Sequence, residues 1–357
     1  MSPQTSRAGE WFLRSGIQEP NGGVARYYRA DWQRNHAVST EITGYAVSAF
    51  VYLHSLTNDP RYLERAVAAA RFLARTAWDA ARRTMPFEME PAEFTYFFDC
   101  GIVVRGLLAA WRGTSGQEFL DVAVALGQSM AADFASHDGD FHPILSLPDK
   151  CPVERDALRW SRMPGCYQLK SAMAWWELFE ATGDPRFRQA YERVLEYSLG
   201  ACARFLPGHT DRLKVMDRLH AFCYFLEGML PRSGDSACAA AIRDGLGRAA
   251  KLLREIAPEF ERADVYAQVL RMRLYADCAG VAPLDCEAAR FEVKMLEGFQ
   301  AADDDPRIDG GYYFGRKGAV WLPYVNPVSS AFASQALELW HNRAQAPLEL
   351  PDMTLLI

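Results

Sequence analysis

Long apolar segments alternate with amphipathic ones along most of the chain, and the alternation recurs six times. Each apolar segment has the length of a helix and is apolar nearly all round, which predicts helices buried on both sides. These leading segments are 40–56, 97–113, 165–181, 218–232, 263–279 and 326–342. The segments that follow them, such as RYLERAVAAARFLARTAWD, have a wider polar face, which is typical of outer helices.

Turn signals separate the two helices of a pair: TNDPRY, GTSGQEF, TGDPRF and RSGDSA combine Gly, Asp and Pro, which end one helix and start the next. After the sixth leading helix only the tail APLELPDMTLLI remains, so one outer helix is lacking, and the N-terminal SRAGEWFLRSGI can supply it. We therefore expect residues 1–357 to form a single all-α domain, whose N-terminal helix closes a ring against the last inner helix.

Two stretches outside the helices have the composition of strands, GGVARYY at 22–28 and GGYYFG at 310–315. Each precedes a leading helix. We expect them to form short β-hairpin or loop pieces over the mouth of the cavity.

Several of these segments resemble those of a known superfamily. GGVARYYRADWQRNHAVSTEITGY, YFFDCGIVVRGLLAA and HAFCYFLEGML are similar to the inner-helix segments of the six-hairpin glycosidase-like superfamily, and DGGYYFGRKGAVWLPYVNPVSSAFASQAL is similar to its closing repeat. The resemblance covers nearly the whole chain and implies an (α/α)6 toroid. It also implies carbohydrate chemistry, since the superfamily contains glycoside hydrolases, polysaccharide lyases and sugar epimerases.

Composition excludes other classes of partner. The formal net charge is −6 and Lys and Arg form no long run, which argues against nucleic acid. No stretch approaches the roughly 20 apolar residues that span a bilayer, and the N-terminus lacks the apolar core of a signal peptide, so we expect a cytoplasmic protein. The eight cysteines form no zinc-ligand spacing, and we expect reduced thiols, no metal and no cofactor.

Carboxylates stand at the start of two leading helices. Glu41 lies in the first turn of the first, with Tyr45 four residues on, and Asp99 opens the second, preceded by Tyr96. Glycosidic cleavage needs one carboxyl group to protonate the leaving oxygen and another to activate water or attack the sugar. We therefore take Glu41 and Asp99 as the preferred catalytic pair, although acidic residues also cap helices at this position.

The fourth leading helix offers different chemistry. His220 and Tyr224 are one turn apart on the same helix face, after Asp217. A His–Tyr pair beside a carboxylate could remove and return a proton, as lyases and epimerases require. His220 could equally bond a sugar hydroxyl or serve as a structural histidine.

Further polar and aromatic residues are candidates for binding a saccharide, because sugar rings combine apolar faces with polar edges. They cluster before the first and last leading helices or open the third: Asp31, Trp32, Arg34, His36, Tyr167, Asp309, Trp321 and Tyr324. The charged residues deeper in the apolar helices, Arg105, Lys170, Glu227 and Arg271, should be paired across neighbouring helices or face the cavity.

These residues favour a glycoside hydrolase that uses Glu41 and Asp99 on an oligosaccharide or a uronate-containing saccharide. One alternative is a polysaccharide lyase or sugar epimerase centred on His220 and Tyr224. Another is a non-catalytic saccharide-binding or scaffold protein in polysaccharide assembly.

Overall fold

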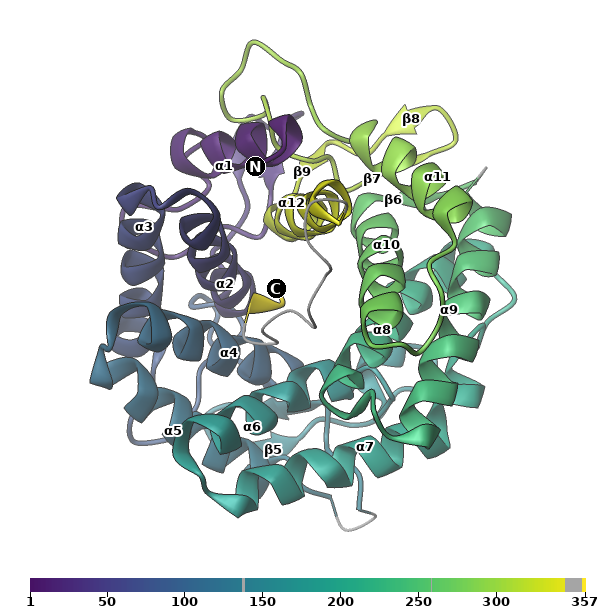
Figure 1. The fold of residues 1–357 in the computed structure, drawn as a ribbon. Coiled ribbons are helices and arrows are strands. Elements are labelled where there is room, and N and C mark those ends of the chain that lie inside the picture. The colour runs from purple at the N-terminus through teal and green to yellow at the C-terminus, as the bar shows by residue number, and fades with distance from the viewer. Residues whose placement is uncertain (137–138, 258, 344–354) are drawn as a thin grey trace. The chain divides into compact units, whose positions relative to one another are not determined.

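The computed structural model describes residues 1–136, 139–257, 259–343 and 355–357 (Figure 1). Its α-helices are α1 (Pro3–Arg14), α2 (Thr40–Thr57), α3 (Pro60–Arg71), α4 (Phe97–Thr114), α5 (Gln117–Asp133), α6 (Gln168–Thr182), α7 (Pro185–Phe205), α8 (Arg212–Gly228), α9 (Ser236–Ile256), α10 (Ala263–Cys278), α11 (Cys286–Glu297) and α12 (Pro327–Asn342). The described residues form two compact units. Unit 1 contains Met1–Ile17, Arg26–His36 and Arg204–Ile357, and unit 2 contains Gln18–Ala25 and Ala37–Ala203.

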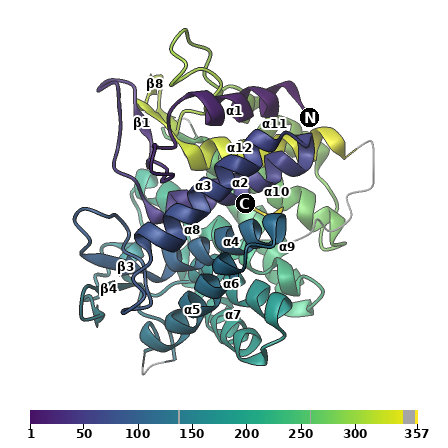
Figure 2. The same cartoon turned by 90° about the vertical axis from the view of Figure 1, so that its left-hand side faces the viewer.

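In unit 2 the inner helices α2, α4 and α6 pack in sequence order, with the outer helices α3 and α5 against α2 and α4. Figure 2 shows α2 and α3 lying side by side. A short turn links them, because Asn58 ends α2 with a left-handed φ of 56° and Asp59 caps α3 by accepting from the Arg61 N–H.

Glycines set the spacing of the inner helices of unit 2. A Cβ added at Gly106 would lie 2.5 Å from the Gly44 carbonyl oxygen, and one added at Gly101 would lie 2.0 Å from the Ser171 hydroxyl oxygen. Only glycine allows backbones to approach this closely. The helices α2, α4 and α6 therefore meet through backbone contacts near their N-terminal halves.

In unit 1 the inner helix α10 packs between α8 and α12, and the N-terminal helix α1 packs against α12. The Thr5 hydroxyl donates to the Ser334 carbonyl oxygen at 3.2 Å, and the Ser2 N–H donates to the Glu338 carboxylate at 2.8 Å. The first helix thus contacts the last one. We propose that this contact closes a single domain of residues 1–357.

Nine short strands form three small antiparallel sheets. They are β1 (Tyr28–Arg29), β2 (Arg34–Asn35), β3 (Phe94–Tyr96), β4 (Ile144–Ser146), β5 (Cys151–Pro152), β6 (Glu261–Arg262), β7 (Gly315–Lys317), β8 (Val320–Trp321) and β9 (Tyr324–Val325). The strands β3, β6 and β9 run directly into α4, α10 and α12. Of the two predicted strand segments, GGVARYY contributes Tyr28 to β1 and GGYYFG contributes Gly315 to β7. Both segments also form isolated β-bridges, at Val24, Ala25, Tyr312 and Tyr313.

Charged residues inside the inner helices are paired, as expected for buried ions. Arg105 on α4 donates to the Glu177 carboxylate on α6 at 2.6 Å. Arg271 on α10 pairs with Glu227 on α8, and both side chains are fully buried. Pairing across neighbouring helices is thereby confirmed for Arg105, Arg271 and Glu227, while Lys170 is fully buried on α6.

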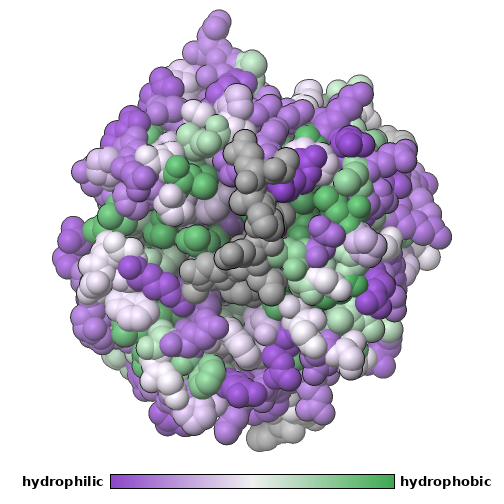
Figure 3. All heavy atoms as spheres, viewed as in Figure 1, coloured by the Kyte–Doolittle hydropathy of each residue, from purple (hydrophilic) through white to green (hydrophobic). Residues whose placement is uncertain are grey.

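Hydrophilic residues dominate the face shown in Figure 3, with apolar residues in small groups. Large apolar side chains that are exposed include Trp32, Val320 and Trp321, all in unit 1. Among the helices described, none is long and apolar enough to cross a lipid bilayer.

Candidate functional site

The helices α2 and α4 begin at the same segment of chain. The Thr40 N–H at the start of α2 donates to the Phe87 carbonyl oxygen at 3.1 Å, and the Phe87 N–H donates to the Phe94 carbonyl oxygen at 2.9 Å, three residues before α4. The two helices are therefore parallel, and their N-termini lie on one side of unit 2.

This arrangement brings Glu41 and Asp99 onto facing sides of the two helices. Glu41 lies one turn before Gly44, and Asp99 lies two turns before Gly106, the two glycines through which α2 and α4 meet. Residues three, four and seven apart share a helix face. At a rise of about 1.5 Å per residue, both carboxylates lie within about one helical turn of the same level. Asp99 is 7% exposed.

Aromatic residues surround this end of unit 2. The Tyr167 hydroxyl, at the start of α6, donates to the Met163 carbonyl oxygen at 3.1 Å. Burial raises the pKa of Tyr167, and the nearby negative charge of Asp99 contributes in the same direction. The Tyr96 ring packs on the Phe87 ring, and Tyr45 is buried next to Gly44. Glu41, Asp99, Tyr45, Tyr96 and Tyr167 thus occupy the same end of unit 2, and their catalytic and binding roles stay predictions.

His220 lies on α8 in unit 1, within a polar cluster of which Asp217 was predicted from the sequence and Arg262, Asp264 and Gln268 were not. Its Nδ1 lies 3.0 Å from the Gln268 Oε1 and 3.3 Å from the Asp264 Oδ2, both on α10. Both oxygens accept hydrogen bonds, so Nδ1 carries the proton and the lone pair is on Nε2. The Tyr224 ring stands edge-on to the imidazole at a centroid distance of 4.5 Å, which confirms that the two residues share a face.

The carboxylate beside His220 is itself paired. Arg262, at the end of β6, donates to Asp264 at 2.6 Å and to Asp217 at 2.9 Å. Although burial acts to raise it, the Arg262 and His220 charges hold the pKa of Asp264 below its usual value. Asp217 is half-exposed, so its role here is to hold Arg262.

The surroundings of His220 keep the imidazole neutral. Burial lowers its pKa to about 4, although the Asp264 charge acts in the opposite direction. The side chain retains 14% exposure, and Nε2 makes no hydrogen bond to any described residue. His220 therefore presents an accessible lone pair at neutral pH, which is the form required of a general base.

The saccharide-binding candidates of the first loop gather in unit 1. Trp32 is 51% exposed, and the Arg29 and Arg34 guanidinium carbons lie 3.8 and 5.0 Å from its ring centre. Asp31 forms an ion pair with Arg29. Arg29 was not predicted, because nothing in the segment GGVARYYR distinguishes it from a surface arginine.

The last-repeat candidates take different places in unit 1. The Tyr27 ring contacts His36 and Tyr324 at centroid distances of 4.8 and 4.9 Å. Trp321 is 39% exposed and contacts Tyr313. Asp309 instead forms a 2.9 Å ion pair with Arg7 on α1, which gives it a part in holding the first helix. Saccharide contact by these residues stays a prediction.

The described residues contain no group of three or more His, Cys, Asp and Glu side chains arranged to hold a metal ion.

Comparison with known proteins identifies the fold. A sugar epimerase from a ruminal bacterium superimposes with a TM-score of 0.72 at 12% identity, covering 93% of this chain and 98% of that one. The (α/α)6 toroid fold is confirmed. A cellobiose 2-epimerase from Spirochaeta thermophila matches at a TM-score of 0.69 and 15% identity over 94% of this toroid and 96% of that chain. A GH76A α-1,6-mannanase from Salegentibacter superimposes with a TM-score of 0.56 at 11% identity. The match covers 94% of this chain and 99% of that one.

These likenesses belong to six-hairpin toroid proteins and extend over nearly the whole chain. No protein-family model matches the sequence, and no curated protein sequence matches it significantly. At this level of identity the likeness shows the fold alone.

Proposed function

We propose that this toroid is a carbohydrate-active enzyme of the epimerase or isomerase type, with His220 as the group that transfers a proton at a sugar carbon. The observation that carries the proposal is the neutral His220, whose Nδ1–H is directed to Asp264 and Gln268 and whose Nε2 is accessible. The likeness to a sugar epimerase and a cellobiose 2-epimerase supports this class of substrate.

The proposed step needs no co-reactant. In an open-chain sugar, Nε2 takes the proton from the carbon next to the carbonyl group, and the electron pair of that C–H bond moves into an enediolate. If the enediolate turns its other face to Nε2, return of the same proton from the imidazolium to that carbon gives the epimer. Return of the proton to the former carbonyl carbon, with the hydroxyl proton moving from the C2 oxygen to the C1 oxygen, gives the ketose. Asp264 stabilises the imidazolium that forms in between, because its carboxylate lies 3.3 Å from Nδ1.

Proton exchange tests the proposal directly. The protein is incubated with mannose, glucose, cellobiose and glucuronate in D2O, and NMR follows deuterium at C2 and the appearance of an epimer or ketose. We expect His220→Gln to slow the exchange by about 100-fold or more, the range typical of a lost general base. His341→Gln, an exposed histidine of the same unit, should retain the wild-type rate.

Two results would overturn the assignment: exchange at the wild-type rate in His220→Gln, or no exchange with any sugar of the panel. Retained sugar binding without any turnover would support the non-catalytic alternative.

Glycoside hydrolysis is a second candidate, favoured by the placement of Glu41 and Asp99 on facing sides of parallel helices. The likeness to an α-1,6-mannanase supports the same class of substrate. Release of reducing ends from mannan, cellulose and uronate oligosaccharides should then be lost in Glu41→Gln and Asp99→Asn. The exposed Glu64→Gln on α3 is the matched control. Hydrolysis that survives both substitutions would exclude this pair.

A further inference from the structure

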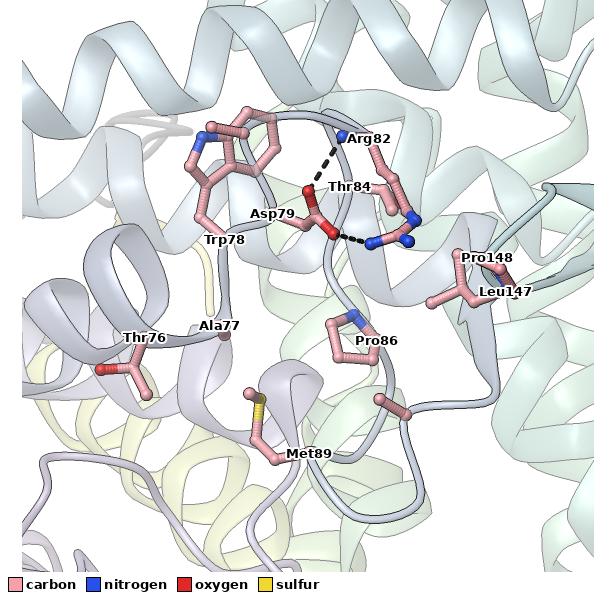
Figure 4. Close-up of a pocket in the computed structure, with 12 residues that line it drawn as sticks. Thr76, Ala77, Trp78, Asp79, Arg82, Thr84, Pro86, Met89, Leu147 and Pro148 are labelled. Carbon is pink, nitrogen blue, oxygen red and sulfur yellow. Dashed lines mark hydrogen bonds and ion pairs between the residues drawn. The ribbon is translucent and has the colours of Figure 1, made fainter.

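Unit 2 contains a cavity of about 550 Å³ beside the loop that joins the end of α3 to α4 (Figure 4). Its wall is formed by the π-helical turn Phe72–Ala77 that extends α3, by the loop itself, and by Leu147 and Pro148 after β4. Pockets for small organic ligands have volumes of roughly 300–1,000 Å³. The cavity is thus large enough for a sugar ring.

The lining combines an indole with polar groups that retain hydrogen-bonding capacity. Figure 4 shows the Trp78 and Arg82 side chains on either side of the Asp79 carboxylate, with Pro86 and Met89 below them in this view. No described residue accepts a hydrogen bond from the Trp78 Nε1–H. A partly exposed indole with a free N–H is a common way of holding a ligand that is apolar on its face and polar at its edge.

Asp79 orients the arginine and is itself satisfied. Its Oδ1 accepts from the Ala81 and Arg82 N–H groups at 3.0 and 2.9 Å, and its Oδ2 pairs with the Arg82 guanidinium. One Arg82 N–H group is used in this pair, and the others make no hydrogen bond to a described residue. Arg82 therefore has donors available for hydroxyl or carboxylate oxygens.

Hydrogen bonds fix the loop at its far side. The Thr84 and Thr95 hydroxyl oxygens are 3.0 Å apart, and the Leu147 N–H donates to the Glu93 carbonyl oxygen at 2.7 Å. The Thr40 hydroxyl on α2 donates to the Pro86 carbonyl oxygen at 2.8 Å. Pro86 lines the cavity, and Thr40 directly precedes Glu41. The cavity is thus preformed and adjoins the N-terminus of α2.

We propose that this cavity is a saccharide-binding site in which a pyranose ring contacts the Trp78 indole and accepts hydrogen bonds from Arg82. The proposal does not depend on the reaction assigned to His220 or to Glu41 and Asp99.

Saturation-transfer NMR tests the site with methyl α-D-mannoside, methyl β-D-glucoside and methyl β-D-glucuronide. These glycosides cannot open their rings and so cannot undergo the proton exchange proposed above. We expect saturation transfer to at least one of them in the wild type, reduced at least five-fold in Trp78→Leu and in Arg82→Gln. The glucuronide arm shows whether Arg82 contacts a carboxylate or a hydroxyl group.

A matched control makes the result specific. Arg75→Gln removes an exposed arginine of the same segment that pairs with Glu118 outside the cavity, and this variant should retain the wild-type signal. No saturation transfer to any of the three glycosides would overturn the proposal. So would a signal that is the same in Trp78→Leu, Arg82→Gln and the wild type, provided that circular dichroism shows both variants to be folded.

Discussion

The protonation of His220 has a measurable consequence for stability. Its pKa is lowered from 6.5 to about 4 in the folded protein, chiefly by burial. The unfolded imidazole, in contrast, titrates with a pKa of about 6.5. At pH 5 about 97% of the unfolded imidazole but only about 10% of the folded one is charged. The unfolded state then binds more protons. The stability that the neutral His220 contributes is therefore fully present above pH 6.5 and is lost as the pH falls toward 4.

Between pH 7 and pH 5 this difference amounts to about 2 kcal/mol of unfolding free energy from one group. Urea unfolding of the wild type and of His220→Gln at both pH values isolates the contribution, because other titrating groups are common to the two proteins. In parallel, ¹⁵N NMR of the imidazole should show a neutral His220 at pH 5. An NMR titration midpoint of His220 near pH 6.5 would refute the reasoning. So would an unfolding free energy that depends on pH equally in the wild type and in His220→Gln.

Three further predictions concern the inner helices. Glu227→Leu leaves the fully buried Arg271 without its carboxylate and should cost about 3–5 kcal/mol in urea unfolding. Gly106→Ala places a Cβ 2.5 Å from a backbone oxygen of α2 and should cost about 1–3 kcal/mol in the same measurement. Burial raises the pKa of the Cys100 thiol to about 12, so iodoacetamide at pH 8 should leave it unmodified in the native protein while the exposed Cys151 reacts.

Each of the three has a control. Adding Arg271→Met to Glu227→Leu should recover most of the lost stability, and Arg186→Met at an exposed ion pair should cost less than about 1 kcal/mol. Gly200→Ala on α7 meets no atom within 4 Å and should not destabilise. Equal losses of unfolding free energy at the buried and the exposed positions would contradict the packing described. Modification of Cys100 as fast as that of Cys151 would also contradict it.

The fold could be predicted from the sequence because its signals are local. The apolar segments 40–56 and 97–113 correspond to α2 (Thr40–Thr57) and α4 (Phe97–Thr114) within a residue. The prediction for the fourth inner helix, 218–232, lies several residues too late in the chain. The helix α8 begins at Arg212 and ends at Gly228, and the Asp211 side chain caps it by accepting from the Leu213 N–H. Pro231 cannot donate a helical hydrogen bond, and a 3-10 turn replaces the expected last turn.

The surroundings of His220 could not be predicted in the same way. Gln268 is 48 residues away, and its contact with His220 depends on how α8 and α10 pack. The first turn of α10 nevertheless contains Asp264, at a position like those of Glu41 and Asp99 in their helices. No residue of this turn was among the candidates predicted from the sequence. A search for an acid in the first turn of every leading helix would have found Asp264.

The helix positions of these acids bear on the choice between the two reactions. Glu41, Asp99 and Asp264 all lie in first turns, where the partial positive charge of the helix N-terminus stabilises a carboxylate. The Asp264 carboxylate is held in its ionised form by Arg262, which pairs with it. Proton transfer at a sugar carbon needs only a neutral base and a carboxylate that stabilises its charged form, and His220 with Asp264 supplies both. The pairing of His220 with Asp264 therefore supports the epimerase or isomerase proposal.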